Sequence, residues 1–288
     1  MRFGSSGPDR GNVLDFVSVM ENCSIRDAAL KIQRWFGRLV TSETPVVSGS
    51  SSLRSPLGRG ISLVEESGNP HPLGFQLQPV DTAHDYLRRR GVDHGTAEFF
   101  GVGFFGGSGV MSGRVVFPIH NESGELIAYG GRALGTVEAR YRFPAGFRKS
   151  LILFNLHRAL DSENGGTVVV VEGFFDCLKV HQAGVGSVVA LMGCTMSGAQ
   201  ERLLKANFRH VILFLDGDDA GRSATSEIAA RLVRHVFVRV VDTPSGAQPD
   251  EMFPEQVRAL LKPAIDCASR FDIHEPFSEG EGSGSRLG

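Results

Sequence analysis

The chain lacks paired cysteines and long apolar runs. Its four cysteines, Cys23, Cys177, Cys194 and Cys267, are widely separated and include no CxxC pair. This spacing argues against a zinc ribbon and a disulfide framework, and it favours reduced thiols in the cytosol. No apolar stretch approaches the roughly 18 residues that span a bilayer. The segment after Met1 lacks the apolar core of a signal peptide, so we expect no membrane association.

The chain also lacks an excess of charge of either sign. Its 288 residues carry a formal net charge of −2, with 41% hydrophobic and 22% charged residues. These proportions are ordinary for a globular protein of one large or two modest domains. The overall balance neither favours nor opposes nucleic-acid binding, so any basic surface for such a partner must be local.

Composition changes mark the ends of the chain. Residues 1–40 carry apolar side chains at helical spacing and predict a small helical unit. Residues 41–72 are rich in Ser, Gly and Pro, and they predict a flexible linker. Residues 266–288 end in a Gly-, Ser- and Glu-rich tail that we expect to be partly disordered.

Residues 73–160 predict a small mixed α+β subdomain. Its expected elements are helices over 80–90 and 92–100, strands over 113–119 and 126–132, and an irregular basic segment over 140–150.

Residues 161–265 alternate apolar strands with helices. We predict strands at 168–172, 187–191, 210–216 and 236–241, and helices at 174–183, 197–206, 219–233 and 254–262. One helix between successive short strands is typical of a right-handed, mostly parallel sheet with helices on both faces. The fold class is therefore α/β, α+β overall, with a Rossmann-like parallel sheet after the smaller basic subdomain.

Carboxylates follow two of these strands. Glu172 ends the first strand, and Asp216-Gly217-Asp218 ends the third. Neighbouring parallel strands end at one edge of a sheet, so these side chains are expected to converge there, and Asp250 beyond the fourth strand reaches the same rim. Clustered carboxylates need a compensating cation, and oxygen-only ligands suit Mg²⁺ or Mn²⁺. A single such motif in a loop is commonly a solvated turn, whereas the combination predicts a metal site.

The acidic motifs resemble a known fold. Glu172-Gly173 followed by Leu215-Asp216-Gly217-Asp218 resembles the TOPRIM fold of bacterial-type primases, topoisomerases and some nucleases. Residues 172–176 and 217–224 resemble the DnaG-type primases in particular. Residues 84–156 resemble the amino-terminal half of the DnaG-type core through the segments 86–91, 114–119 and 130–134. The likeness extends over about 84–252.

The resemblance implies a nucleotidyltransferase that makes short RNA primers from ribonucleoside triphosphates on single-stranded DNA. Glu172, Asp216 and Asp218 would be catalytic and would hold one or two divalent ions. Asp176 lies one helical turn after Glu172, so we expect it to be a further ligand or to support one. The predicted metal ligands are thus Glu172, Asp176, Asp216, Asp218 and Asp250.

Binding a triphosphate and a template backbone requires cations. Arg114 and Arg132 lie on paired strands and are expected to face one groove. The resemblance places Arg140, Tyr141 and Lys149 near the nucleotide triphosphate. For each single arginine the alternative is a solvated surface charge. The run Arg88 to Arg90 is interpreted as a helix-end cap that complements the helix dipole.

The sequence departs from the primase pattern at two places. Gln248-Pro249-Asp250 replaces the usual Asp-Pro-Asp, which removes one negative charge and predicts weaker metal binding there. Residues 1–37 resemble only the end of a primase zinc ribbon, without the upstream Cys and His ligands. We therefore expect no zinc, and either a truncated gene product or a degenerate ribbon. Helicase contact is not expected, because little sequence follows Asp250.

Two alternatives are left open: a TOPRIM nuclease, and a nucleic-acid-binding remnant with little catalysis. A topoisomerase is disfavoured because its nucleophilic tyrosine lies on a further domain, whereas Tyr86, Tyr129 and Tyr141 all precede the acidic cluster. An OLD-type nuclease usually carries an ATPase domain, and the sequence holds no Walker motif. The expected location is the cytoplasm, at the nucleoid or replication fork.

Overall fold

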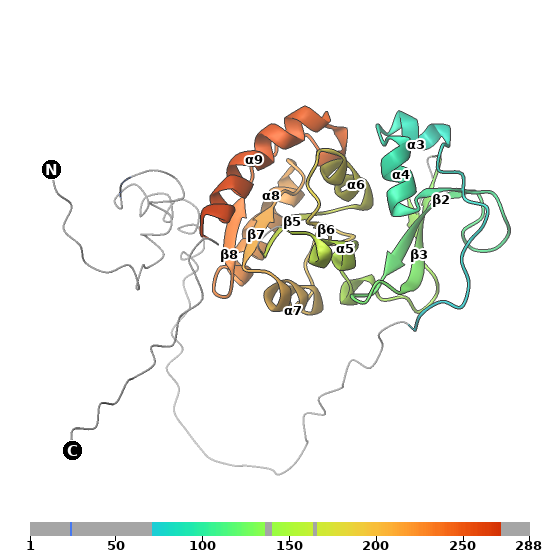
Figure 1. The fold of residues 1–288 in the computed structure, drawn as a ribbon, viewed down its shortest axis with the longest axis horizontal. Coiled ribbons are helices and arrows are strands. Elements are labelled where there is room, and N and C mark those ends of the chain that lie inside the picture. Colours follow the sequence, from blue (N-terminus) through green and yellow to red (C-terminus); the bar gives the residue numbers. More distant parts are fainter. Residues whose placement is uncertain (1–23, 25–70, 136–139, 164–165, 272–288) are drawn as a thin grey trace, which may run out of the picture. The chain divides into compact units, whose positions relative to one another are not determined.

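The computed structural model describes residue 24 and residues 71–135, 140–163 and 166–271 (Figure 1). Our predictions for the helical unit at 1–40, for nearly all of the linker at 41–72 and for the end of the tail lie outside the described residues. The residues described from 71 onward belong to one compact unit, residues 70–288. No helix in the described ranges is long and apolar enough to cross a membrane.

Two short helices and an antiparallel sheet begin this unit. The helices are α3 (Asp85–Arg89) and α4 (His94–Phe100), and the sheet has the order β1-β2-β3-β4. Its strands are β1 (Gly103–Phe105), β2 (Arg114–His120), β3 (Leu126–Ala133) and β4 (Tyr141–Arg142). The predicted strands over 113–119 and 126–132 are confirmed. The segment predicted to be irregular contains β4 and a short 3-10 helix, η2 (Lys149–Leu151).

The first predicted helix, 80–90, begins too early. Asp81 forms a bridge with Phe104 through backbone hydrogen bonds of 2.8 and 2.9 Å, which holds this residue in extended backbone. The helix therefore starts only at Asp85. The second helix matches its prediction: the Asp93 side chain accepts a hydrogen bond from the Thr96 N–H at 2.6 Å, and Gly101 ends the helix in left-handed conformation.

A parallel sheet of order β6-β5-β7-β8 forms the second half (Figure 1). Its strands are β5 (Thr167–Val171), β6 (Val188–Ala190), β7 (His210–Leu213) and β8 (Phe237–Val240). The helices are α5 (Leu156–Asp161), α6 (Phe174–Gln182), α7 (Gly198–Asn207), α8 (Asp219–Leu232) and α9 (Pro254–Phe271), with a 3-10 turn η3 (Pro249–Glu251). All four predicted strands and the three helices between them are confirmed. The last helix continues to Phe271, beyond the expected end of the domain at 265.

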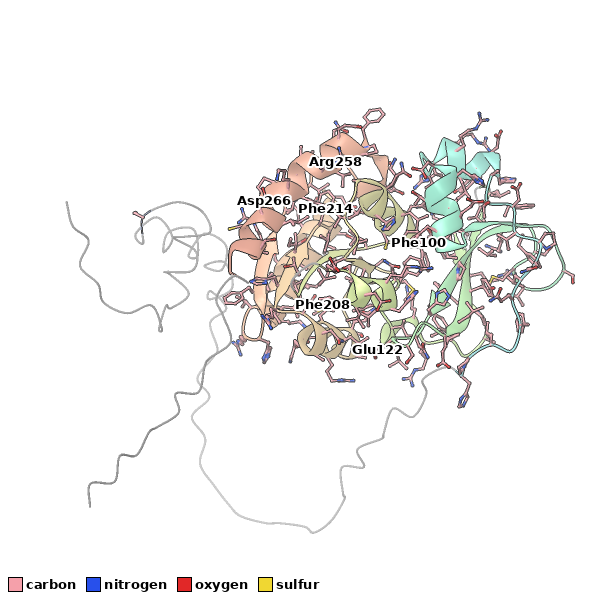
Figure 2. All side chains as sticks on the ribbon, viewed as in Figure 1. Phe100, Glu122, Phe208, Phe214, Arg258 and Asp266 are labelled. Carbon is pink, nitrogen blue, oxygen red and sulfur yellow. The ribbon has the colours of Figure 1, made fainter. Side chains whose placement is uncertain are left out.

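The parallel sheet is covered on both faces, which explains its uninterrupted apolar strands. Val169 and Val171 of β5 face the core that includes α6 and α9, whereas Val168 and Val170 face the core that includes α7 and α8. Figure 1 shows α9 and α7 on opposite sides of the strands. Phe214, just after β7, is buried beneath α9, whose Arg258 and Asp266 are exposed (Figure 2).

The basic subdomain and the parallel sheet share one hydrophobic core. Phe117 of β2 stacks on Phe174 of α6 with ring centroids 4.6 Å apart. Gly130 makes this approach possible, because a β-carbon there would lie 2.9 Å from the Phe174 ring. The boundary that we predicted near residue 160 therefore separates two kinds of sheet but not two cores.

Candidate metal and nucleotide site

The carboxyl ends of β5 and β7 bring two acidic side chains together, as the sequence predicts. Glu172 follows β5 directly, and its Oε1 accepts a hydrogen bond from the Asp216 backbone N–H at 3.2 Å. Asp216 lies three residues after β7, and its Oδ1 is buried without a hydrogen-bond partner. A buried carboxylate oxygen without a donor is costly, so this position favours an added cation.

Asp218, which follows Asp216 closely in the chain, also caps a helix. It is the N-cap of α8, where its Oδ1 accepts a hydrogen bond from the Gly221 N–H at 2.7 Å. The turn is tight at both glycines: a β-carbon at Gly217 would lie 2.1 Å from the Pro244 carbonyl oxygen, and one at Gly221 would lie 2.2 Å from that of Asp216. The glycines thus allow α8 to start against the end of β7.

The field at this edge opposes ionisation. Burial raises the pKa of Asp216 to about 7, and the charges of Glu172, Asp218 and Asp250 add to the effect. Burial likewise raises the pKa of Glu172; the hydrogen bond from Asp216 opposes that shift and Asp218 strengthens it. In the described part of the chain no lysine or arginine forms an ion pair with Glu172, Asp216 or Asp218. A divalent cation would supply the missing positive charge.

The full set of five predicted metal ligands is not assembled around one point. Among the described residues, no three His, Cys, Asp or Glu side chains are grouped so that they could hold one ion. The donor type and the orphaned Asp216 oxygen fit a hard cation. Metal binding by Glu172, Asp216 and Asp218 therefore stays a prediction.

Both carboxylate oxygens of Asp176, predicted as a further metal ligand or as support for one, contact backbone N–H groups. It is the third residue of α6, and its Oδ2 accepts a hydrogen bond from the Gly173 N–H at 2.8 Å. Its Oδ1 accepts another from the Asp250 N–H at 3.1 Å. Burial, together with the charges of Asp250 and Asp216, raises the pKa of this side chain to about 8. Both oxygens thus bind backbone, so the carboxylate organises the start of α6.

Asp250 is paired with a residue that the sequence analysis missed. Its Oδ2 forms an ion pair with Arg90, whose guanidinium also lies over the Phe175 ring at 4.9 Å from the centroid. The Asp250 side chain is only 7% exposed. By its backbone Arg90 is the C-cap of α3, as interpreted, but its side chain reaches across 160 residues of sequence. Nothing local distinguishes Arg90 from Arg88 and Arg89, so only the fold reveals this contact.

The expectation that Arg114 and Arg132 face one groove is wrong. In the β2–β3 register Arg132 is opposite Val115, and Arg114 is opposite Ala133. Side chains alternate along a strand, so the two arginines lie on opposite faces of the sheet. Arg132 faces the shared core, where it donates hydrogen bonds to the hydroxyls of Tyr86 at 2.6 Å and Tyr141 at 3.1 Å. Arg114 donates to the Gly131 carbonyl at 3.3 Å.

The other predicted nucleotide-binding residues are spread along one segment. Tyr141 is half-buried on β4, and burial raises its pKa to about 12. Arg140 precedes it and is exposed. The Lys149 ammonium donates a hydrogen bond to the Met192 carbonyl at 2.7 Å, and the neighbouring Gly193 N–H donates to the Glu172 carbonyl at 3.2 Å. Lys149 therefore lies beside the loop that adjoins Glu172.

Comparison with known proteins agrees with this architecture. Residues 169–253 match the Toprim-like family, and residues 107–160 match the family described as the N-terminal domain of the DNA primase catalytic core. The parallel sheet with acidic residues at its carboxyl edge thus defines a TOPRIM protein.

The relatives are more particular. A DNA primase of Thermotoga maritima is 28% identical over 91% of this chain and 52% of its own length. One of Staphylococcus aureus is 31% identical over 72% of this chain and 36% of its own. A DnaG primase catalytic domain bound to single-stranded DNA has 27% identity and a TM-score of 0.54, over 63% of this chain and 71% of the other. The chain is thus similar to bacterial DnaG-type primases, and it spans about half or less of these curated relatives.

Proposed function

We propose that the protein synthesises short RNA primers on single-stranded DNA by template-directed nucleotidyl transfer. The single observation that carries the proposal is the pair of carboxylates, Glu172 and Asp216, at the adjoining ends of β5 and β7. The similarity to DNA primases supports the same activity, and divalent-metal use is implied for TOPRIM primases. Primer synthesis takes place on DNA that is being replicated, and this is consistent with the cytoplasmic location that we expect from the wide spacing of the cysteines.

The metal-holding residues would be Glu172, Asp216 and Asp218. A bound Mg²⁺ or Mn²⁺ would offset negative charge at the reacting phosphate. The protein's own contribution is to keep these oxygens in place: the Asp216 N–H orients Glu172, and the cap on α8 orients Asp218. Gln248, which stands where the resemblance to DnaG-type primases predicts an acid, contributes no negative charge.

Nucleotide and template contacts would come from the basic segment. Lys149 lies next to the loop beside Glu172, so its ammonium is the best placed of the predicted cations for a triphosphate. Exposed Arg140 suits a phosphate of the template or nucleotide. Arg132 and Tyr141 hold each other inside the protein, and we assign them to positioning this segment.

The decisive experiment is primer synthesis on single-stranded DNA with four ribonucleotides and Mg²⁺ or Mn²⁺. RNA product is expected from the full chain. Asp216→Ala should abolish the product while leaving DNA retention nearly unchanged, because the variant removes a carboxylate and no basic group. Cleavage of the template would indicate a nuclease instead, and retention without turnover would indicate a binding remnant.

A further inference from the structure

The five carboxylates that the sequence predicts as metal ligands fall into two groups with different surroundings. Glu172, Asp216 and Asp218 form no ion pair with a lysine or arginine within the described ranges. Asp250 does form one, with Arg90, and it is linked to Asp176 by a hydrogen bond from its own backbone N–H. One group thus lacks a cation, whereas the other already contains one.

Several contacts hold Arg90 against the second group. The backbone carbonyl of Gly91, the residue after Arg90, accepts hydrogen bonds from Lys179 at 3.1 Å and Gln182 at 3.0 Å, both on α6. Gly91 has a φ of +69°, and a β-carbon there would lie 2.7 Å from the Lys179 ammonium. The end of α3 is therefore fixed to the helix that carries Asp176. Arg90 further stacks over Phe175, the residue before Asp176.

The second group also has other positive charge nearby. Arg132 and Lys179 both act on Asp250 electrostatically, in addition to Arg90. Arg132 lies over the same Phe175 ring at 5.3 Å from the centroid. A divalent ion arriving at Asp250 would meet these cations and would have to displace Arg90, which is unfavourable in a partly buried site.

We propose that Arg90 is the resident cation of the Asp176–Asp250 pair, so that the protein without nucleotide takes up a single divalent ion, at the edge formed by Glu172, Asp216 and Asp218. Arg90 is then a positioning residue that occupies the place of a second metal. The inference depends on the metal site of the proposed function, and it adds the number of ions and the residue that sets it.

The test is the number of Mn²⁺ ions bound per full chain in the absence of nucleotide, measured by titration with electron paramagnetic resonance. We expect a single ion for the wild type and for Arg90→Lys. Arg90→Gln should bind a second ion, because it removes the cation that is paired with Asp250. Arg88→Gln is the control, since Arg88 belongs to the same run but pairs with exposed Asp85, and it should leave the number unchanged.

The outcomes separate this inference from the proposed function. Two ions on the wild type, or a single ion on folded Arg90→Gln, would overturn the inference alone. No bound ion on the wild type would remove the proposed metal site as well. If Arg90→Gln does not fold, Asp250→Asn decides. This variant should change the Mn²⁺ affinity by less than about twofold, whereas substitution of a metal ligand would lower the affinity at least about tenfold.

Discussion

At the residue scale, Asp216 is placed for function at a cost in stability. Its Oδ1 is buried without a donor, and its neighbours are Glu172 and Asp218. The raised pKa of Asp216 means that the folded protein holds a proton which the unfolded chain, with an ordinary aspartate pKa, has already released above pH 4. The contribution of Asp216 to stability should therefore fall as pH rises from about 4 to about 7, and level off above its folded-state pKa.

Asp216→Asn should raise the Tm of the metal-free protein, and by more at pH 8 than at pH 4.5. The asparagine cannot ionise, so it avoids the penalty that grows through this window. We expect a difference of a few degrees in scanning calorimetry, on the order of 1 kcal/mol for a domain of this size. Asp242→Asn, at an exposed position outside the site, is the control. Equal shifts at both pH values would contradict the electrostatic explanation.

Lys149 allows a test of the nucleotide position. Lys149→Ala should raise the KM for ribonucleotides by about tenfold, equivalent to roughly 1.4 kcal/mol of binding, because a charge beside the Glu172 loop is lost. The matched control is Lys262→Ala, which removes an exposed lysine on α9 paired with Asp266. Steady-state primer synthesis at varied nucleotide concentration gives both values. An unchanged KM for Lys149→Ala would remove this residue from the nucleotide site.

At the scale of elements, the start of α8 depends on its close approach to β7. Gly221→Ala places a methyl group 2.2 Å from the Asp216 carbonyl oxygen, so the helix must shift and carry the Asp218 cap with it. We expect a loss of about 1–3 kcal/mol in unfolding free energy, as for other overpacked sites, together with weaker Mn²⁺ binding. Urea unfolding and Mn²⁺ titration measure the two effects.

The matched control is Gly198→Ala at the start of α7. A β-carbon there would meet its nearest neighbour, the Arg202 guanidinium, at an ordinary 3.7 Å. This variant should be neutral or slightly stabilising, because alanine reduces the entropy of the unfolded chain. If the two alanine variants behaved alike, the tight contact at Gly221 would not be what shapes the site.

The sequence was sufficient to predict some elements of the structure but not the contacts between distant ones. The strands β5 and β7 were predicted because strands covered on both faces read as continuous apolar runs, and the carboxylates at their ends followed from parallel topology. The relative faces of Arg114 and Arg132 could not be predicted without the register, since a shift by one residue reverses every side chain. The Arg90–Asp250 contact joins residues 160 apart, and no local pattern encodes it.

At the scale of the whole molecule, the proposed binding of DNA must depend on local charge. The chain has a net charge of −2, so at long range it does not attract a polyanion. Affinity for single-stranded DNA should fall steeply with salt, with a slope of about −0.7 per phosphate contact in a plot of log K against log salt concentration. Arg140→Ala should reduce that slope by about one contact, measured by fluorescence anisotropy. A salt-independent affinity would rule out phosphate contacts as its source.

The stacking of Phe117 on Phe174 has a consequence for how such proteins diversify. A hybrid gene could join the first half of one such protein to the second half of another near residue 160. The aromatic rings at positions 117 and 174 would then come from different proteins, and their shapes need not match. Such a hybrid protein should express poorly unless both rings and the glycine at position 130, which allows their close approach, come from the same parent. The two halves therefore depend on each other for the core that they share.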